Sequence, residues 1–343
     1  MILKKVLVLL SFSLIITFYG CIKSKPALAE EVELIVNNSE FNGVVLISQN
    51  NEQSLLKAKG FADIEKRVPL KTSDLFVIGS ISKQITAVLI LKEFEKGSIT
   101  LHDPISKYLK LAQPWSNTIT IHHLLTHTHG IVDVNQDLAF EVGSQFQYSQ
   151  LGYELLANIL EKVKGQSFQE ISTAFFRENG LMKTFHPADT TYSDLVKGYI
   201  QNSDSTFTFE TTSLENYVPA GALISNVEDL QLWNKLLYSG VLVNFETLEL
   251  MKTRYATREH PIFGKVEYGY GLLFKDGQAN VEVGAFGYAP AFVSACYYYP
   301  EIKTSIVVLE NVARNLEDFK KTFAVHSEIM ALAKQAALKE SGL

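Results

Sequence analysis

A serine and a lysine stand three residues apart at the start of an apolar segment. They are Ser80 and Lys83 in the stretch GSISKQITA, residues 79–87. On a helix, positions i and i+3 share a face, so the Lys83 amine can approach the Ser80 hydroxyl. A lysine desolvated by apolar neighbours loses its proton more readily and can act as a base. The pair therefore predicts a serine nucleophile, with the Ser80 backbone N–H, unpaired in a first helical turn, available to an oxyanion.

A second match to the S-x-x-K pattern occurs at Ser54 and Lys57. This pair falls in a segment that is expected to be a strand, where residues three apart point to opposite faces. Geometry therefore excludes it as a nucleophile and base.

Two further stretches carry residues suited to this chemistry. Tyr148 precedes a helical run, and a tyrosine oxygen near a lysine can share its proton transfer. The alternative is a structural tyrosine whose hydroxyl only finds a hydrogen-bond partner. The stretch 283–290, VGAFGYAP, has closely spaced glycines that indicate close backbone approach in a strand. A β-bulge is the alternative for these glycines.

Four histidines fall close together at positions 122, 123, 127 and 129. They include no H-E-x-x-H motif and no interleaved carboxylate. We therefore expect core and surface histidines rather than a metal site, and no metal or organic cofactor.

The elements around these residues follow from periodicity. Residues 43–48 and 53–59 predict a β-hairpin, and 80–96 predicts a buried helix that Gly97 ends. Helical patterns follow at 119–126, 149–164, 168–178 and 229–238, with Ser225 or Asn226 capping the last. Strands are expected at 270–275, 280–285, 291–299 and 304–310, before a final helix at about 315–338. This order predicts an α+β fold with an antiparallel sheet shared by the first and last segments.

The N-terminus predicts export. Lys4 and Lys5 precede an uncharged run, residues 6–19, that is too short to span a bilayer comfortably. Residues 1–29 are therefore read as an export signal, with two competing sites: acylation of Cys21, which would tether the protein to a membrane, or cleavage after Ala29. Cys296 would then be the only cysteine of the folded body, and its strand-like surroundings predict a small buried hydrophobe. The net charge of −6 over 343 residues gives no support to a nucleic-acid partner.

The motifs together resemble the serine β-lactamase and penicillin-binding-protein superfamily, in particular its class C β-lactamase, D-alanyl-D-alanine carboxypeptidase and esterase branch. Residues 76–83 resemble the first block of that family, and 119–130 resemble its I-T-I-x-H-L-L-T-H-T-S-G block. Residues 220–225, with Asp229 and Trp233, and 268–271 resemble later blocks. The similarity covers roughly residues 35–312.

This resemblance implies roles for individual residues. Ser80 would be the acylated nucleophile, Lys83 its base and Tyr148 the second proton-transfer residue. The backbone N–H groups of Ser80 and Tyr288 would form the oxyanion hole. The family fold implies one hydrolase domain over residues 30–343, with a sheet lobe at about 35–75 and 265–343, an all-helical lobe mainly at 76–240, and the site between them.

The chain departs from the family pattern at the substrate-binding positions. Gln150 replaces an asparagine, which adds a methylene, and Ala285 replaces a lysine or histidine two residues before Gly287. Loss of that cation removes an anchor for a substrate carboxylate. We therefore expect an exported serine hydrolase for small-molecule or peptide-like substrates that is more esterase-like than an efficient β-lactamase. A binding or regulatory module with weakened chemistry is the alternative; the oligomeric state is left open.

Overall fold

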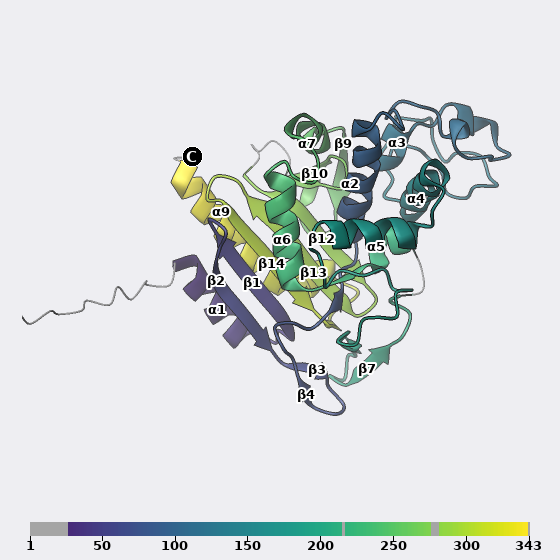
Figure 1. Cartoon of the computed structure of the whole chain (residues 1–343). Helices are drawn as coiled ribbons and strands as arrows, with labels where there is room; N and C mark the ends of the chain where they lie inside the picture. Colours follow the sequence, from purple (N-terminus) through teal and green to yellow (C-terminus); the bar gives the residue numbers. More distant parts are fainter. Residues whose placement is uncertain (1–26, 215–216, 276–280, 342–343) are drawn as a thin grey trace, which may run out of the picture.

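An antiparallel eight-stranded sheet forms the centre of the molecule (Figure 1). The computed structural model describes residues 27–214, 217–275 and 281–341. The first hairpin lies beside a strand from the C-terminal part of the chain, so the two ends of the chain share one sheet, as expected. In spatial order the strands are β2 (Glu52–Lys59), β1 (Gly43–Gln49), β14 (Thr304–Glu310), β13 (Phe292–Tyr299), β12 (Val283–Ala289), β11 (Leu273–Lys275), β10 (Gly264–Tyr268) and β9 (Ala256–His260).

Alternation along the central strands decides which layer each side chain joins. Val45 and Ile47 of β1 pack with α1 (Ala27–Asn38) and α9 (Ala324–Ser341) on one face. Val44 and Leu46, which point the other way, join the larger core with α2 (Ile81–Glu95) and α6 (Val227–Tyr238). Successive strand residues point to opposite faces, and both sets are apolar and buried here. The sheet is therefore covered on both sides.

The predicted helices are present with small changes at their ends. The helix expected at 168–178 is α5 (Phe168–Glu178), and Asn226 caps α6 by accepting from the Asp229 N–H at 2.8 Å. The helix expected at 315–338 is divided in two at Phe323. The other described helices are α3 (Ile121–Leu125), α4 (Gln150–Lys164), α7 (Phe245–Lys252), α8 (Phe319–Thr322), two short 3-10 helices, η1 (Ile105–Lys107) and η2 (Pro114–Asn117), and a π-helix, η3 (Val218–Ala222).

Some elements were not expected from the sequence. Strands β9 and β10 form an antiparallel hairpin that extends the sheet beyond β11. The strand expected at 280–285 is β12, which continues to Ala289, four residues further than expected, and so includes Tyr288. Small sheets pair β3 (Phe61–Asp63) with β4 (Val68–Pro69), β5 (Phe76–Val77) with β8 (Ile224–Ser225), and β15 (Val312–Ala313) with β6 (Gly198–Gln201) and β7 (Phe207–Glu210).

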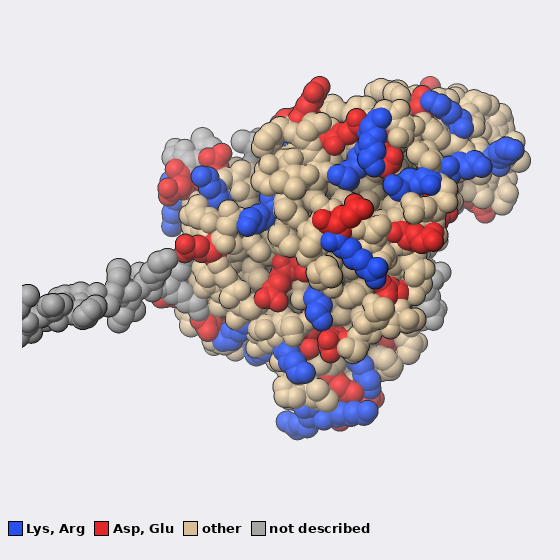
Figure 2. Space-filling model, in the orientation of Figure 1, with Lys and Arg blue, Asp and Glu red and all other residues tan. Residues whose placement is uncertain are grey.

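Cys296 is a small buried residue, as predicted. Its side chain has no exposed surface, and its thiol lies 3.4 Å from Asn234 Oδ1. Burial raises the pKa of this thiol to about 12, so it stays protonated. Within the described residues, no helix is long and apolar enough to cross a membrane. The face drawn in Figure 2 carries interspersed acidic and basic side chains.

Candidate active site

Ser80 lies where a short strand turns into a buried helix. β5 ends at Val77, Gly79 takes a left-handed conformation (φ +54°), and Ser80 is the N-cap of α2. No hydrogen bond is made by the Ser80 backbone N–H to any described residue, as expected for a residue at a helix start. The half-buried hydroxyl therefore has a free backbone donor directly beside it.

Lys83 lies one turn further along α2 and is almost fully buried, with 1% of its surface exposed. Its Nζ is 3.4 Å from Ser80 Oγ and 2.8 Å from the Ala220 carbonyl oxygen, and it also donates to Gln150 Oε1. A neutral amine has two N–H donors and one lone pair. With both donors used by Ala220 and Gln150, the lone pair is left for the Ser80 hydroxyl.

The electrostatic surroundings of Lys83 favour this neutral form. Desolvation by burial lowers the pKa of its amine, and the nearby Arg258 charge lowers it further, while Tyr148 acts in the opposite direction. A lowered pKa brings the amine toward the range in which a base is free to accept a proton at neutral pH.

Tyr148 contacts both Ser80 and Lys83. Its hydroxyl donates to Ser80 Oγ at 2.8 Å, and its ring centroid lies 4.5 Å from Lys83 Nζ. A purely structural tyrosine would pair with an ordinary core acceptor, whereas this hydroxyl, 36% exposed as a residue, has the candidate nucleophile as its partner. The geometry therefore favours the proton-transfer role.

A buried histidine positions Tyr148. His127 accepts a hydrogen bond from the Ser149 backbone N–H at Nδ1 (3.1 Å), so its other nitrogen carries the proton and donates to Tyr268 OH (3.2 Å). Burial holds the pKa of His127 well below its usual value, which keeps the ring neutral. Its centroid lies 4.6 Å from that of Tyr148, so the ring also supports the tyrosine by packing.

The glycines of the two motifs allow the helix start and β12 to touch. A Cβ on Gly79 would lie 2.5 Å from the Tyr288 backbone nitrogen, and a Cβ on Gly287 would lie 2.2 Å from the Ile78 carbonyl oxygen. The β12–β13 register runs without a shift from Val283 to Ala289, so the glycines mark close approach rather than a β-bulge. This approach brings the Tyr288 amide next to the Ser80 turn, where the predicted oxyanion hole requires it.

A cavity of about 220 Å³ opens at this junction. Among the predicted site residues it reaches Ser80, Tyr148, Gln150, Gly287 and Tyr288, whereas Lys83 lies beneath it. Ala285 does not line this cavity; it is 8% exposed and packs in the larger core. The remaining lining residues are Arg258, His260, Pro261, Ile262, Phe286, Phe319 and Phe323.

Two polar lining residues, Arg258 and His260, were missed by sequence reasoning. Both lie on β9, a strand that was not expected, and neither belongs to a motif. The Arg258 guanidinium carbon lies 4.8 Å from the Tyr148 ring centroid, which places a cation beside the nucleophile. The residue types of β9 give only a weak signal for a strand. Nothing in that segment shows that it will lie near Ser80, because this position is set by the folded chain.

The other clustered histidines have local structural partners. His122 pairs with Tyr270 OH at 2.8 Å, His123 takes part in the N-cap of α3, and His129 accepts from the Ile131 N–H at 2.9 Å. In the described part of the chain, no group of three or more His, Cys, Asp or Glu residues is placed to hold a metal ion.

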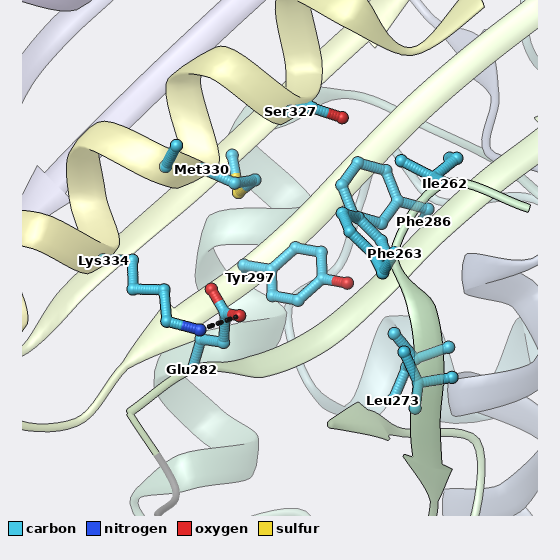
Figure 3. A pocket seen from close by; sticks show the side chains of 11 residues that line it. Ile262, Phe263, Leu273, Glu282, Phe286, Tyr297, Ser327, Met330 and Lys334 are labelled. Atoms are coloured by element: carbon cyan, nitrogen blue, oxygen red, sulfur yellow. Dashed lines mark hydrogen bonds and ion pairs between the residues drawn. The ribbon is translucent and has the colours of Figure 1, made fainter. Parts of the chain in front are cut away.

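A second cavity, of about 280 Å³, lies between α9 and the sheet (Figure 3). Its lining is mainly apolar, with a Lys334–Glu282 ion pair of 3.1 Å at one side. Phe286 and Ile262 line both this cavity and the one at Ser80. Ser80, Lys83 and Tyr148 do not line this cavity.

The fold and this site are those of a serine hydrolase, with a serine and a lysine at the start of a buried helix. Comparison with known proteins agrees: the family model described as Beta-lactamase matches residues 32–330, and the chain belongs to this family. The predicted superfamily and the α+β fold are thereby confirmed.

Individual relatives and solved structures show which members of the family the chain resembles. The chain is 25% identical over 331 residues to a teichoic acid D-alanine hydrolase of Staphylococcus aureus (strain MRSA252), covering 86% of this chain and 76% of the relative. It resembles the crystal structure of a penicillin binding protein from Bacillus halodurans with a TM-score of 0.76 and 25% identity, over 88% and 98% of the two chains. D-amino acid amidase from Ochrobactrum anthropi SV3, with a TM-score of 0.77 over 92% and 99% but 19% identity, shares the fold.

Proposed function

We propose that this protein is an exported serine esterase that works through an acyl-enzyme on Ser80. The observation that carries the proposal is the Ser80–Lys83–Tyr148 triangle, in which Lys83 Nζ lies 3.4 Å from Ser80 Oγ and the Tyr148 hydroxyl donates to the same oxygen. Nucleophile, base and free oxyanion donor within contact of one another are the arrangement that acyl transfer requires.

The proposed reaction divides into two steps. In the first, Ser80 Oγ attacks the ester carbonyl and gives its proton to Lys83, while the Ser80 and Tyr288 N–H groups stabilise the oxyanion. The carbon–oxygen bond to the alcohol then breaks, and the leaving oxygen takes a proton through Tyr148. In the second, water attacks the acyl-enzyme by the same route and releases the acid.

An ester preference over β-lactams follows from the substrate side of the site. The position that carries a cation in the family's third motif is Ala285, which does not reach the cavity. A β-lactam or a peptidoglycan stem brings a carboxylate that this position can no longer bind. The relative named teichoic acid D-alanine hydrolase supports D-alanyl derivatives as candidate substrates.

The test compares two serines. Ser80→Ala should abolish ester hydrolysis and labelling by a fluorophosphonate probe, with the adduct mapped by mass spectrometry, whereas Ser54→Ala should leave both unchanged. Ser54 is a suitable control because it belongs to the rejected S-x-x-K match and its hydroxyl donates to the Ile47 carbonyl in the β1–β2 hairpin. A label on Ser54 would refute the nucleophile assignment. Absence of any label or turnover in the wild type would favour the binding or regulatory module.

A further inference from the structure

A cation without an acidic partner faces the catalytic cavity. Among the described residues, Arg258 makes no ion pair, and its guanidinium carbon instead lies over the rings of Tyr148 (4.8 Å) and Phe146 (5.4 Å). None of the residues that line the cavity is an aspartate or a glutamate. Lys83, the other basic side chain nearby, is directed to Ala220, Gln150 and Ser80. The cavity therefore holds a positive charge that no described side chain compensates.

The burial of Arg258 costs desolvation free energy, which a bound anion can offset. Burial lowers the pKa of its guanidinium, which shows that its charge is partly removed from water, yet arginine remains charged in proteins. A partly desolvated charge is destabilising unless an opposite charge or hydrogen bonds replace the lost water. The planar guanidinium suits carboxylates and phosphates, which it can bind through two parallel hydrogen bonds.

The position of Arg258 indicates which half of the substrate carries the anion. Tyr148 donates to Ser80 Oγ, and in the proposed mechanism it protonates the leaving alcohol, which places that alcohol next to the Tyr148 hydroxyl. The Arg258 guanidinium lies over the ring of the same tyrosine and lines the same cavity as the Tyr148 side chain. Much of the remaining wall is apolar and offers no second site for a charge; it is formed by Pro261, Ile262, Phe286, Phe319 and Phe323.

We propose that Arg258 binds an oxyanion, a carboxylate or a phosphate, on the alcohol half of the ester substrate. The inference rests on the proposed esterase function and names its substrate class: acyl esters of anionic alcohols. The cation that the family's third motif places on β12, at the position of Ala285, is absent here, and Arg258 on β9 supplies a cation instead. A substrate anion would therefore lie in a different direction from the scissile bond than in that motif.

The experiment uses three esters of one acid: butyryl glycerol, butyryl glycerol 3-phosphate and butyryl glycerate. We expect kcat/KM to be higher for at least one anionic ester than for the neutral one. Arg258→Gln should lower that anionic-to-neutral ratio about ten- to a hundredfold, the worth of one charge-assisted hydrogen bond. Arg258→Lys should restore part of the ratio. Whichever anionic ester is preferred distinguishes phosphate from carboxylate.

A matched control and a binding measurement complete the test. Arg177→Gln removes the same charge from the exposed face of α5 and should leave the ratio unchanged. Calorimetry on Ser80→Ala should detect glycerol 3-phosphate or glycerate, with binding at least about tenfold weaker after Arg258→Gln.

The two hypotheses fail in different ways. If the wild type hydrolyses none of the esters, the esterase proposal fails, while calorimetry still reports on the anion site. If Arg258→Gln lowers kcat/KM equally for all three esters and leaves anion binding unchanged, Arg258 only supports Tyr148 and the inference is overturned.

Discussion

At the scale of single residues, the site depends on how Lys83 is held. A flexible lysine would present its charge to water, whereas here two acceptors fix the amine and burial lowers its pKa. Gln150 supplies one of those acceptors, so the extra methylene relative to the family's asparagine is used to reach Lys83. The departure at position 150 therefore fits an intact base rather than a degraded site.

Lys83 gives a pH dependence with a defined sign. In the proposed mechanism the neutral amine is the base, so kcat/KM for a neutral ester should fall as pH falls through the lowered pKa of Lys83. Gln150→Leu removes an acceptor that favours the charged amine, so the acid limb of the pH profile should move to lower pH. The plateau should fall about tenfold as the lone pair loses its orientation.

The control for this prediction is Gln147→Leu, at an exposed position before Tyr148. Its backbone N–H bond to the His127 carbonyl would be kept, so the pH profile should match the wild type. An acid limb that stays in place or moves to higher pH in Gln150→Leu would contradict the role given to Gln150.

At the scale of elements, the proposed mechanism requires that β12 touch the first turn of α2. In that mechanism the helix supplies the nucleophile and the base, and the strand supplies the Tyr288 amide, so a small separation would remove the oxyanion hole. Glycine at position 79 serves two purposes here, because it permits a positive φ and leaves room for the Tyr288 backbone.

Substitutions at two glycines separate these purposes. Gly97 also has a positive φ (+73°), but a Cβ there would meet nothing within 4 Å. Gly97→Ala should therefore cost only about 1–2 kcal/mol of unfolding free energy and leave kcat unchanged. Gly79→Ala should be more destabilising and should also lower acylation by about a hundredfold or more, as loss of an oxyanion donor does. Urea unfolding and burst kinetics measure the two effects; equal behaviour of the two variants would contradict the close-approach argument.

At the scale of the whole molecule, the two ends of the chain are joined through the sheet. Glu310, at the end of β14, accepts from the Asn42 N–H (3.0 Å) before β1 and pairs with Arg314 (3.2 Å). His326 at the start of α9 lies 3.7 Å away and is also fully buried. Desolvation raises the pKa of Glu310 to about 7 and lowers that of His326 to about 3. This buried cluster connects β1, β14 and α9.

Glu310 should make stability depend on pH. Its folded pKa lies above the usual value of 4.5, so the folded state binds more protons than the unfolded state between those two pH values. Stability contributed by Glu310 should therefore fall as pH rises through this window, by on the order of 3 kcal/mol. The measurement is the difference in unfolding free energy between wild type and Glu310→Gln, at about pH 5 and about pH 8. A difference that does not change with pH would show that the charged carboxylate is fully satisfied in the fold.

The attachment of the molecule is also testable. Cys21 lies outside the described residues, whereas Ala29 lies in the first turn of α1 and is 1% exposed against the sheet. Cleavage after Ala29 would remove the start of this packed helix, which supports acylation of Cys21 as our proposal. Cys21→Ser should then release the protein from the membrane fraction. Identical fractionation of the variant and wild type as soluble protein would support cleavage after Ala29 instead.

The sequence by itself determined the local features. Ser80 and Lys83 could be paired from spacing alone, because helical periodicity places residues three apart on one face whatever the rest of the chain does. The same holds for α5, for the first hairpin and for the burial of Cys296, each of which depends on a short-range pattern. The family motifs added Tyr148 and Tyr288, which no local rule connects to Ser80.

Tertiary structure decided what short-range patterns do not encode. Gln150 accepts from Lys83, and Arg258 faces Ser80, only because α4 and β9 are brought to the helix start from 67 and more residues away in sequence. Ala285 is the opposite case. Its position in a motif predicted a substrate contact, but in the folded chain its side chain packs in the core. Contacts of this kind arise from the packing of whole elements, and packing depends on all the residues of the core at once rather than on any one segment.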